Sequence, residues 1–200
     1  MKQSKIIGLT GSIATGKSQV TKILKEMSYK VIDSDLIARD VMDDREVIEK
    51  IKKNFGENLY RDNKLDRQAL GKIIFNSLEK KELLDSITHP LIYKKIFEEI
   101  NMNKDENLLF IDIPLLIENG INSYEMNFYE VWLVYSDKKT QIKRLMERDN
   151  IDESYAKAKI SSQMSIEDKK DYADIIIDNR GNLKDLKNQV IARLKYLESL

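Results

Sequence analysis

Residues 11–18 read Gly-Ser-Ile-Ala-Thr-Gly-Lys-Ser, and their types and spacing suit phosphate binding. The string matches Gly-x-x-x-x-Gly-Lys-Ser/Thr, and it follows an apolar run and opens a helical pattern, as this motif requires. Gly11 and Gly16 allow a tight turn that brings backbone N–H groups against phosphate oxygens. We expect Lys17 to reach the β- and γ-phosphates and the Ser18 hydroxyl to bind Mg²⁺. A glycine-rich turn without a ligand is the alternative interpretation.

Two carboxylates follow the second apolar run, in the string Val-Ile-Asp-Ser-Asp at residues 31–35. Open α/β sheets bind ligands at the carboxyl ends of their strands, so Asp33 is expected to face the same crevice as the phosphate loop. There it would orient the attacking hydroxyl or accept its proton. Asp35 would assist it or help to hold metal-bound waters. For Asp35 the alternative is helix capping, in which Ser34 or Asp35 starts a helix near Leu36.

A third carboxylate, Asp112, ends the apolar run at residues 108–112. At a strand end beside a phosphate loop, an aspartate can hold Mg²⁺ through water. The alternative is a turn residue that precedes Pro114.

Several basic residues could neutralise charge on a transferred phosphoryl group. Arg144 and Arg148 are four residues apart in a helical pattern, so they share one face. They are predicted to belong to a lid, although Glu147 and Asp149 also fit a solvated helix face. Arg39 follows the two aspartates by about one helical turn and could reach a substrate phosphate.

His89 is the only histidine and is followed by Pro90. A lone histidine cannot form a histidine-based metal cluster. We expect Pro90 to start a helix that runs to Met102. The histidine itself either packs structurally or contacts the acceptor substrate.

The elements that must position these residues alternate between strand and helix patterns. Apolar runs predict strands at residues 6–9, 108–113, 131–135 and 174–177, with a weaker one at 30–32. Helical patterns cover 16–27 and 182–200. Continuous apolar strands separated by helices favour a mainly parallel central sheet covered on both faces.

Two long segments lack strand signals. Residues 36–104 far exceed the ~10–12 residues that a crossover needs, so we predict a helical substrate-binding insertion there. Residues 137–171 are charged and helical, and we predict that they form a lid. The nucleotide-binding core would then comprise residues 1–35, 105–136 and 172–200 of a single domain.

Composition narrows the functional classes. Lysine plus arginine and aspartate plus glutamate both number 34, so the basic excess typical of nucleic-acid binders is missing. Cysteine is absent, which excludes disulfides and thiol chemistry. The longest apolar stretch, 108–117, contains Asp112 and Pro114 and is too short to span a bilayer. We expect a cytoplasmic protein without nucleic-acid or membrane partners, either a monomer or a weak homo-oligomer.

At this point the chain resembles the dephospho-CoA kinase family. The resemblance covers residues 6–181 and is most specific in Asp-x-Asp-x-Ile-Ala-Arg, His-Pro and Asp-Ile-Pro-Leu-Leu. It is carried by these strings: IIGLTGSIATGKS, VIDSDLIARDV, LDRQALGKIIF, ITHPLI, FIDIPLLIE, RLMERD, ISSQM and DIIIDNRG.

The resemblance implies a kinase with a phosphate-loop (P-loop) core, a helical CoA-binding part and a helical lid. It implies transfer of the ATP γ-phosphate, with Mg²⁺, to the ribose 3′-hydroxyl of dephospho-CoA. Asp33, Lys17 and Arg144 would be catalytic, and Ser18 and Asp112 would hold the metal. The implied ATP-binding residues are Gly11, Ser12, Ile13, Ala14, Thr15, Gly16, Lys17, Ser18, Gln19, Arg144, Arg148, Asn179 and Gly181. The implied acceptor-binding residues are Asp33, Asp35, Arg39, His89 and Leu115. Lys159 stands where the family has an arginine.

Two rival functions share the phosphate-loop argument. One is another P-loop kinase acting on a nucleotide or small metabolite. Only the insertion and the family strings distinguish it from a dephospho-CoA kinase. The other is a GTPase, because residues 63–66 spell Asn-Lys-Leu-Asp. That string sits in a polar turn rather than after a buried strand, and no Asp-x-x-Gly follows the strand of Asp112, so we interpret it as accidental.

Overall fold

The computed structural model describes residues 4–61, 64–124 and 126–200, and the chain forms two compact units. We call residues 1–33 and 103–200 the sheet unit and residues 34–102 the helical unit. None of the described helices combines the length and apolar character needed to cross a bilayer.

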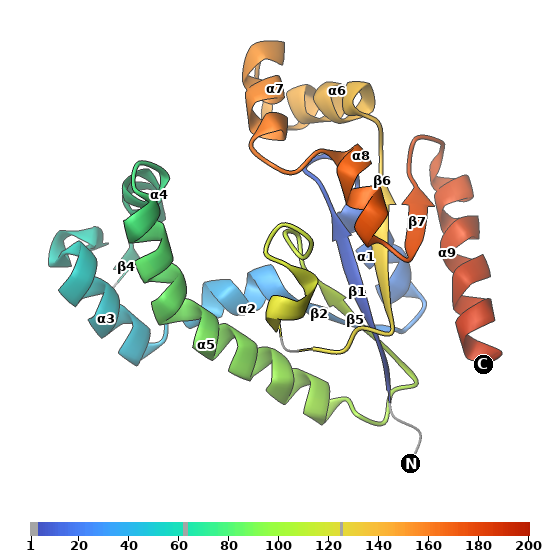
Figure 1. The fold of residues 1–200 in the computed structure, drawn as a ribbon, viewed down its shortest axis with the longest axis horizontal. Helices are drawn as coiled ribbons and strands as arrows, with labels where there is room; N and C mark the ends of the chain where they lie inside the picture. The colour runs from blue at the N-terminus through green and yellow to red at the C-terminus, as the bar shows by residue number, and fades with distance from the viewer. Residues whose placement is uncertain (1–3, 62–63, 125) are drawn as a thin grey trace. The chain divides into compact units, whose positions relative to one another are not determined.

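The sheet unit alternates strands with helices along the chain (Figure 1). Its elements are β1 (Lys5–Gly11), α1 (Lys17–Glu26), β2 (Lys30–Asp33), β5 (Leu108–Asp112), the 3₁₀ helix η2 (Ile121–Tyr124), β6 (Glu130–Tyr135), α6 (Lys138–Asp149), α7 (Glu153–Ser161), α8 (Ile166–Lys169), the 3₁₀ helix η3 (Lys170–Tyr172), β7 (Ile175–Asp178) and α9 (Leu183–Glu198).

The strands form one five-stranded sheet in the order β2-β5-β1-β6-β7. Each neighbouring pair is parallel, which confirms the predicted parallel sheet. Parallel pairing brings the carboxyl ends of all strands to one edge. In this register Asp33 lies opposite Asp112, and Asp112 lies opposite Leu9, two residues before the phosphate loop.

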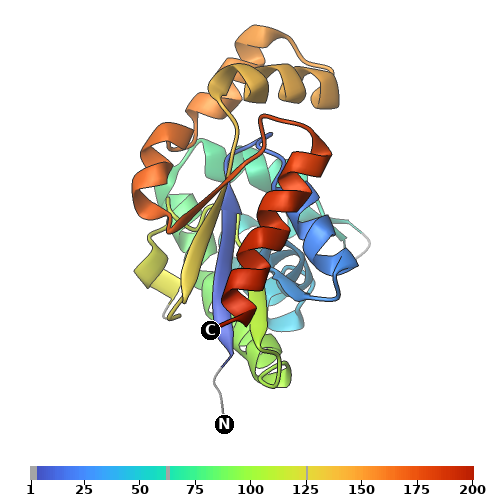
Figure 2. The same cartoon turned by 90° about the vertical axis from the view of Figure 1, so that its right-hand side faces the viewer.

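One face of the sheet is covered by α1 and α9. Trp132 and Val134 of β6 point to this face and are fully buried with apolar residues of both helices. Figure 2 shows α9 running along the sheet. The helix begins after Asn182, whose side chain accepts a hydrogen bond from the N–H of Asp185. Its buried residues are Leu186, Val190, Leu194 and Leu197, which recur at helical spacing.

The opposite face receives the alternate residues of β6. Leu133 and Tyr135 pack there with Ile117 and Ile166 of α8. A buried ion pair lies near the same helix, since Lys169 is fully buried and its Nζ is 2.5 Å from Oε1 of Glu118. Burial of this pair ties the chain after β5 to α8.

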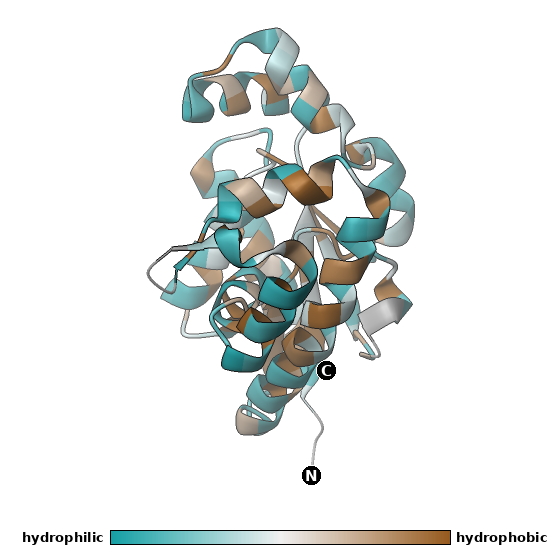
Figure 3. Ribbon diagram, turned by 90° about the vertical axis from the view of Figure 1, so that its left-hand side faces the viewer, coloured by the Kyte–Doolittle hydropathy of each residue, from teal (hydrophilic) through white to brown (hydrophobic). Residues whose placement is uncertain are grey.

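The helical unit has its own core. Its elements are α2 (Ser34–Val41), α3 (Arg45–Phe55), the 3₁₀ helix η1 (Glu57–Leu59), β3 (Tyr60–Arg61), β4 (Lys64–Leu65), α4 (Arg67–Phe75) and α5 (Leu78–Met102). Figure 3 shows brown apolar and teal polar residues mixed along these helices, as expected of helices with one buried face. The buried residues of this core are Val41, Val47, Ile51, Leu59, Leu70 and Leu84.

The sequence-based expectations differ from the structure at three points in this unit. The short antiparallel hairpin β3–β4 was not expected in the insertion. Helix α2 begins at Ser34, so Asp35 lies in its first turn and not before it. Pro90 lies inside α5 and does not start a helix. The helix continues because residues on both sides of Pro90, such as Leu84 and Leu91, pack into the same core.

Candidate active site

The phosphate loop connects β1 to α1 and depends on both of its glycines. Gly16 has φ 90°, and a Cβ there would lie 2.0 Å from Nδ2 of Asn179. A Cβ on Gly11 would lie 2.7 Å from Oγ1 of Thr15. Side chains at either position would therefore displace groups that shape the loop.

Ala14 gives the loop a strained residue. Its φ is 60°, in the left-handed region, where an L-residue costs roughly 1–2 kcal/mol. The loop is closed nearby by the N–H and hydroxyl of Thr15, which both donate to the carbonyl of Ser12 at 3.2 and 2.9 Å. The Ser12 hydroxyl is buried without a hydrogen-bond partner among the described residues. A polar atom of this kind, inside a phosphate loop, is available to a bound nucleotide.

Lys17 is engaged by a carboxylate of the neighbouring strand. Its ammonium group donates to Oδ1 of Asp112. The other oxygen of Asp112 accepts from the hydroxyl of Thr21 at 2.8 Å, and both Asp112 and Thr21 are buried. Asp33 lies beside Asp112 in the sheet register, and exposed Ser18 lies in the first turn of α1. Two carboxylates, an ammonium and a hydroxyl are thus positioned by adjacent ends of β2, β5 and α1.

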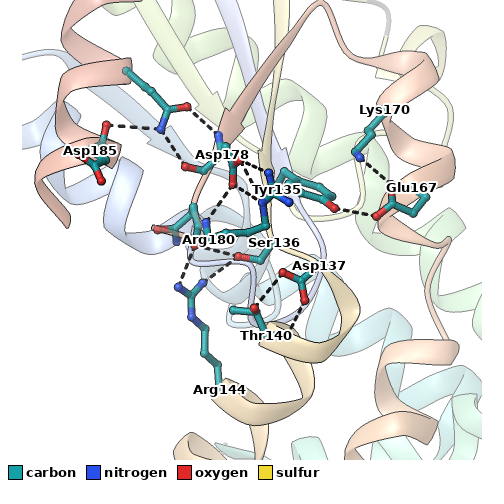
Figure 4. Close-up of polar contacts among 12 residues, drawn as sticks. Tyr135, Ser136, Asp137, Thr140, Arg144, Glu167, Lys170, Asp178, Arg180 and Asp185 are labelled. Atoms are coloured by element: carbon teal, nitrogen blue, oxygen red, sulfur yellow. Dashed lines mark hydrogen bonds and ion pairs between the residues drawn. The ribbon is translucent and has the colours of Figure 1, made fainter. Parts of the chain in front are cut away.

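A second group of polar residues joins the ends of β6 and β7 to the loop. Buried Asn179 donates through Nδ2 to the Thr15 carbonyl at 2.8 Å and to Oε1 of Gln19 at 3.0 Å. The carbonyl of Asn179 accepts from Nη2 of Arg144 at 2.8 Å and from the Ser136 hydroxyl at 3.0 Å. Figure 4 shows the Arg144 guanidinium pointing to these strand ends. Arg144 is therefore held by the strand ends and the loop, and its predicted catalytic role stays a prediction.

The remaining predicted lid residue pairs with a carboxylate beside it. Arg148 donates to Asp149 at 2.8 Å, and Lys159 donates to the same carboxylate at 3.0 Å. These hydrogen bonds, that of Arg148 first, lower the pKa of Asp149 to about 2. Asp149 in turn raises the pKa of Arg148 through the same hydrogen bond. Lys159, at the position where arginine was expected, thus shares an anion with Arg148.

Two cations lie close to the aromatic ring of Tyr135, at the end of β6. Lys170 lies 4.0 Å and Arg180 5.3 Å from the ring centroid of Tyr135. The Tyr135 hydroxyl donates to Glu167 at 2.8 Å, and burial, followed by that bond, raises the pKa of the tyrosine (Figure 4). Arg180 also bonds Asp178, which fixes the turn before exposed Gly181. Sequence reasoning missed this group, since no motif marks it.

The predicted acceptor-binding residues fall in different parts of the chain. Asp33 and Leu115 belong to the sheet unit, and Leu115 is 38% exposed in the segment after β5. Exposed Asp35 and Arg39 lie on α2 of the helical unit. His89 lies on α5, where its Nε2 is 3.5 Å from Oδ1 of Asp85 and its ring is 5.6 Å from that of Tyr93. Their roles stay predictions.

The Asn-Lys-Leu-Asp string at residues 63–66 resembles a guanine-recognition motif, and its described residues lie in or beside local secondary structure. Asn63 lies outside the described residues, and Lys64 and Leu65 form β4. The Asp66 side chain accepts from the N–H of Ala69 at 2.9 Å and so caps α4. This capping gives Asp66 a structural role and favours the accidental interpretation.

Two glutamines were also missed by sequence reasoning. The Ile13 N–H donates to Oε1 of Gln163 at 2.8 Å, and the Ile13 carbonyl accepts from Nε2 of Gln141 at 2.9 Å. Side-chain bonds to backbone groups carry no residue spacing of their own. The burial of a polar residue in α6, with Gln141 only 1% exposed, is the structural sign of this contact.

The donor set suits Mg²⁺ held jointly with phosphates. Among the described residues, no group of three or more histidine, cysteine, aspartate or glutamate side chains is arranged so that it could hold a metal ion. Mg²⁺ characteristically takes one or two protein oxygen ligands and keeps waters and substrate phosphates. The Ser18 hydroxyl and the Asp112 carboxylate could supply oxygen ligands of that kind.

The parallel sheet and the loop between β1 and α1 place the chain in the class of P-loop kinases. Shikimate kinase from Acinetobacter baumannii shares the fold, with a TM-score of 0.55 at 16% identity, and covers 98% of this chain and 95% of its own. The dephospho-CoA kinase family model matches residues 5–185. The chain belongs to the dephospho-CoA kinase family.

Individual relatives agree with this assignment. The chain is 40% identical over 194 residues to the dephospho-CoA kinase of Carboxydothermus hydrogenoformans, covering 95% of this chain and 93% of the relative. The Staphylococcus epidermidis enzyme is 39% identical and is covered to 98%, as is this chain. The solved dephospho-CoA kinase of Campylobacter jejuni superposes with a TM-score of 0.71 at 35% identity, with 95% of each chain covered. These matches confirm the predicted kinase class and family.

Proposed function

We propose that the chain transfers the γ-phosphate of ATP to the ribose 3′-hydroxyl of dephospho-CoA, giving CoA and ADP. Family membership supports the reaction. The observation that carries the site assignment is the register of Asp33 beside Asp112, whose carboxylate bonds Lys17 of the phosphate loop. The carboxylate that we propose for the acceptor hydroxyl is thus on the strand next to β5, whose Asp112 bonds Lys17.

The transfer forms one bond between the acceptor oxygen and the γ-phosphorus and breaks the bond to the β-phosphate oxygen. The Lys17 ammonium and the N–H groups of the loop would hold the phosphates. Asp33 would orient the hydroxyl and receive its proton late, because a loose transition state needs little early deprotonation. Ser18 and Asp112 would hold Mg²⁺, which neutralises phosphate charge when bound.

Residues around the end of β7 would bind the nucleoside side of ATP. Asn179 and Gly181 follow this strand, and the contacts of Asn179 to Thr15 and Gln19 place it against the loop. Arg144 and Arg148 would add positive charge from α6. Lys159 would support the same lid, with a point charge in place of an arginine fork.

The helical unit would carry the acceptor-binding residues Asp35, Arg39 and His89, and Leu115 would contribute from the segment after β5. The alternative is another P-loop kinase with a different small-molecule acceptor. We expect the enzyme to act as a monomer or weak homo-oligomer, which its elution volume on size exclusion would test.

The deciding experiment measures ADP release with ATP and Mg²⁺ in the presence of dephospho-CoA, AMP, adenosine or no acceptor. We expect strong stimulation by dephospho-CoA alone, with CoA identified as the product by mass spectrometry. Stimulation by AMP or adenosine instead would favour the alternative kinase. No stimulation by any of these three acceptors would contradict the proposed reaction and would direct the search to other small-molecule acceptors.

The role of Asp33 is tested by Asp33→Asn, which keeps the size of the side chain and removes its charge. We expect CoA formation to fall by at least 100-fold, within the range of ~10²–10⁴ typical of a positioned acid or base. ADP affinity, measured by calorimetry, should stay within about twofold of the parent because Asp33 is not expected to touch the nucleotide. An equal loss of both would contradict this role.

A further inference from the structure

Ile13 of the phosphate loop is held at three points by the segment that contains α6 and α7. Its N–H donates to Gln163 and its carbonyl accepts from Gln141, at 2.8 and 2.9 Å. Its side chain packs against the apolar cluster of Leu145, Ala156 and Ile160. Both polar groups of this residue and its side chain are therefore engaged by one neighbouring segment.

The two glutamines are themselves firmly placed. Gln141 lies in the first turn of α6, which is capped by Asp137 through the N–H and hydroxyl of Thr140, both at 3.0 Å (Figure 4). The pKa of Asp137 is lowered, chiefly by the hydrogen bond from the Thr140 N–H. Gln163 follows α7, and its N–H donates to the carbonyl of Ile160 at 3.2 Å. A capped helix and a bonded turn thus present the two amides to the loop.

The residue held by these hydrogen bonds, Ile13, immediately precedes the strained residue Ala14. Ala14 has φ 60° without being glycine, and such a conformation persists only where surrounding structure fixes it. On its other side, Thr15 is fixed by its two bonds to the Ser12 carbonyl. The hydrogen bonds of Ile13 restrain the backbone before Ala14 in the same way. The bonds of Ile13 and Thr15 together fix the orientation of the N–H groups of the loop.

We propose that Gln141 and Gln163 are positioning residues that hold the Ile13–Ala14 backbone in the form that receives nucleotide phosphates. The segment of α6 and α7 then supports the phosphate loop as well as supplying lid cations. This inference rests on nucleotide binding at the loop, as proposed above, but not on the identity of the acceptor.

The test uses the whole chain and ADP as the probe, titrated by calorimetry without any acceptor. Gln163→Met removes the acceptor for the Ile13 N–H at similar volume. We expect the Kd for ADP to rise roughly tenfold, which corresponds to about 1.4 kcal/mol. Gln68→Ala, at an exposed position of α4, is the control and should leave the Kd unchanged.

The Ala14→Gly variant tests whether Gln163 positions the backbone of the phosphate loop or only stabilises the fold. Glycine adopts positive φ readily, so the loop should need less restraint from Gln163. In the Ala14→Gly background, Gln163→Met should raise the Kd by threefold or less, and the difference between the two backgrounds is the coupling of a double-mutant cycle. An equal rise in both backgrounds would overturn the proposal. So would a lower melting temperature of Gln163→Met with an unchanged Kd, which would indicate structural support only.

Gln141→Glu provides a second variant of the same size. It replaces the amide that donates to the Ile13 carbonyl with an oxygen that can only accept when ionised. We expect weaker ADP binding here too, and a Kd equal to the parent's would overturn the role of Gln141. Since ADP binding is read without an acceptor, failure of dephospho-CoA as a substrate would leave the outcome of this test intact.

Discussion

Replacing Gly16 by alanine tests how tightly the phosphate loop is built against the end of β7. Two effects act at this position, since φ is 90° and the new Cβ would lie 2.0 Å from Nδ2 of Asn179. The positive φ costs an L-residue roughly 1–2 kcal/mol. Moving Asn179 breaks its bonds to Thr15 and Gln19, each of about 1 kcal/mol.

Alanine also reduces the conformational entropy of the unfolded chain, and this offsets about 0.4–1 kcal/mol of the destabilisation. The net loss in the free energy of unfolding is therefore about 2–3.6 kcal/mol. We further expect ADP binding to be lost, because the same movement displaces the Thr15 carbonyl contact that shapes the loop.

Substitutions at two other glycines distinguish the cost of the positive φ from the cost of the contact with Asn179. Gly120 has φ 84° but no atom within 4 Å of a built Cβ, so Gly120→Ala should lose only about 1 kcal/mol. Gly71 lies inside α4, also with no atom within 4 Å, and no positive φ is recorded there. Gly71→Ala should gain about 0.5–1 kcal/mol from the helix preference of alanine.

Urea unfolding followed by fluorescence suits Gly16→Ala and Gly120→Ala, because the single tryptophan, Trp132, is fully buried in β6 of the same unit. Gly71 belongs to the helical unit, so its variant is followed by circular dichroism. If Gly16→Ala destabilises no more than Gly120→Ala, the contact with Asn179 does not constrain the loop and the reasoning is refuted.

Three further predictions concern polar contacts. Thr21→Val removes the hydroxyl that bonds Asp112 and should raise the Mg²⁺ concentration for half-maximal activity several-fold, whereas Thr21→Ser should restore it; equal behaviour of the two variants would count against this role. The ion pairs of Asp149 lower its pKa to about 2, so their stabilisation is present above the unfolded pKa of ~3.9 and is lost as the pH falls through about 2. The melting temperature of Asp149→Asn should therefore lie below that of the parent at pH 7, and the difference should close near pH 2. Lys169→Met leaves the buried carboxylate oxygens of Glu118 without their cation and should cost about 3–5 kcal/mol of unfolding free energy, most of it recovered in Lys169→Met/Glu118→Leu; a full loss in the double variant would show that the charge is not the cause.

The fold of the sheet unit was predictable because its strands are nearly continuous apolar runs. All five predicted strands exist, and none of their ends is shifted by more than two residues; Lys30–Asp33, for example, extends the weakest of them to include Asp33. Such buried parallel strands need little context to be recognised. The hairpin of β3 and β4 escaped because its strands have two residues each, too few to show a period.

The prediction at Pro90 failed for a different reason. Proline lacks the N–H that a helix interior needs, so a helix start was the local expectation. In α5 that local loss is outweighed by the burial of Leu84 and Ile96, which lie on either side of the proline within one continuous helix. Tertiary packing of this kind is not visible in the residues next to the proline.

Some residues of the candidate site could be predicted from the sequence and others could not. The loop and Asp112 could be found from the sequence because a motif or a strand end marks them. Gln141, Gln163 and Thr21 could not, since their contacts are with single backbone or carboxylate groups that the fold alone brings near. Arg144 was found as a cation, but its bonds to Ser136 and Asn179 follow from the packing of two strand ends.

The ion pair of Lys17 with Asp112 bears on the proposed nucleotide site. In this structure the lysine already has an anion, so a triphosphate that binds there as proposed would have to exchange with the carboxylate. Such an exchange would lower the net gain from the contact of Lys17 with a phosphate and would thereby favour release of the product. The ion pair also gives the partly buried ammonium of Lys17 a partner when no nucleotide is bound.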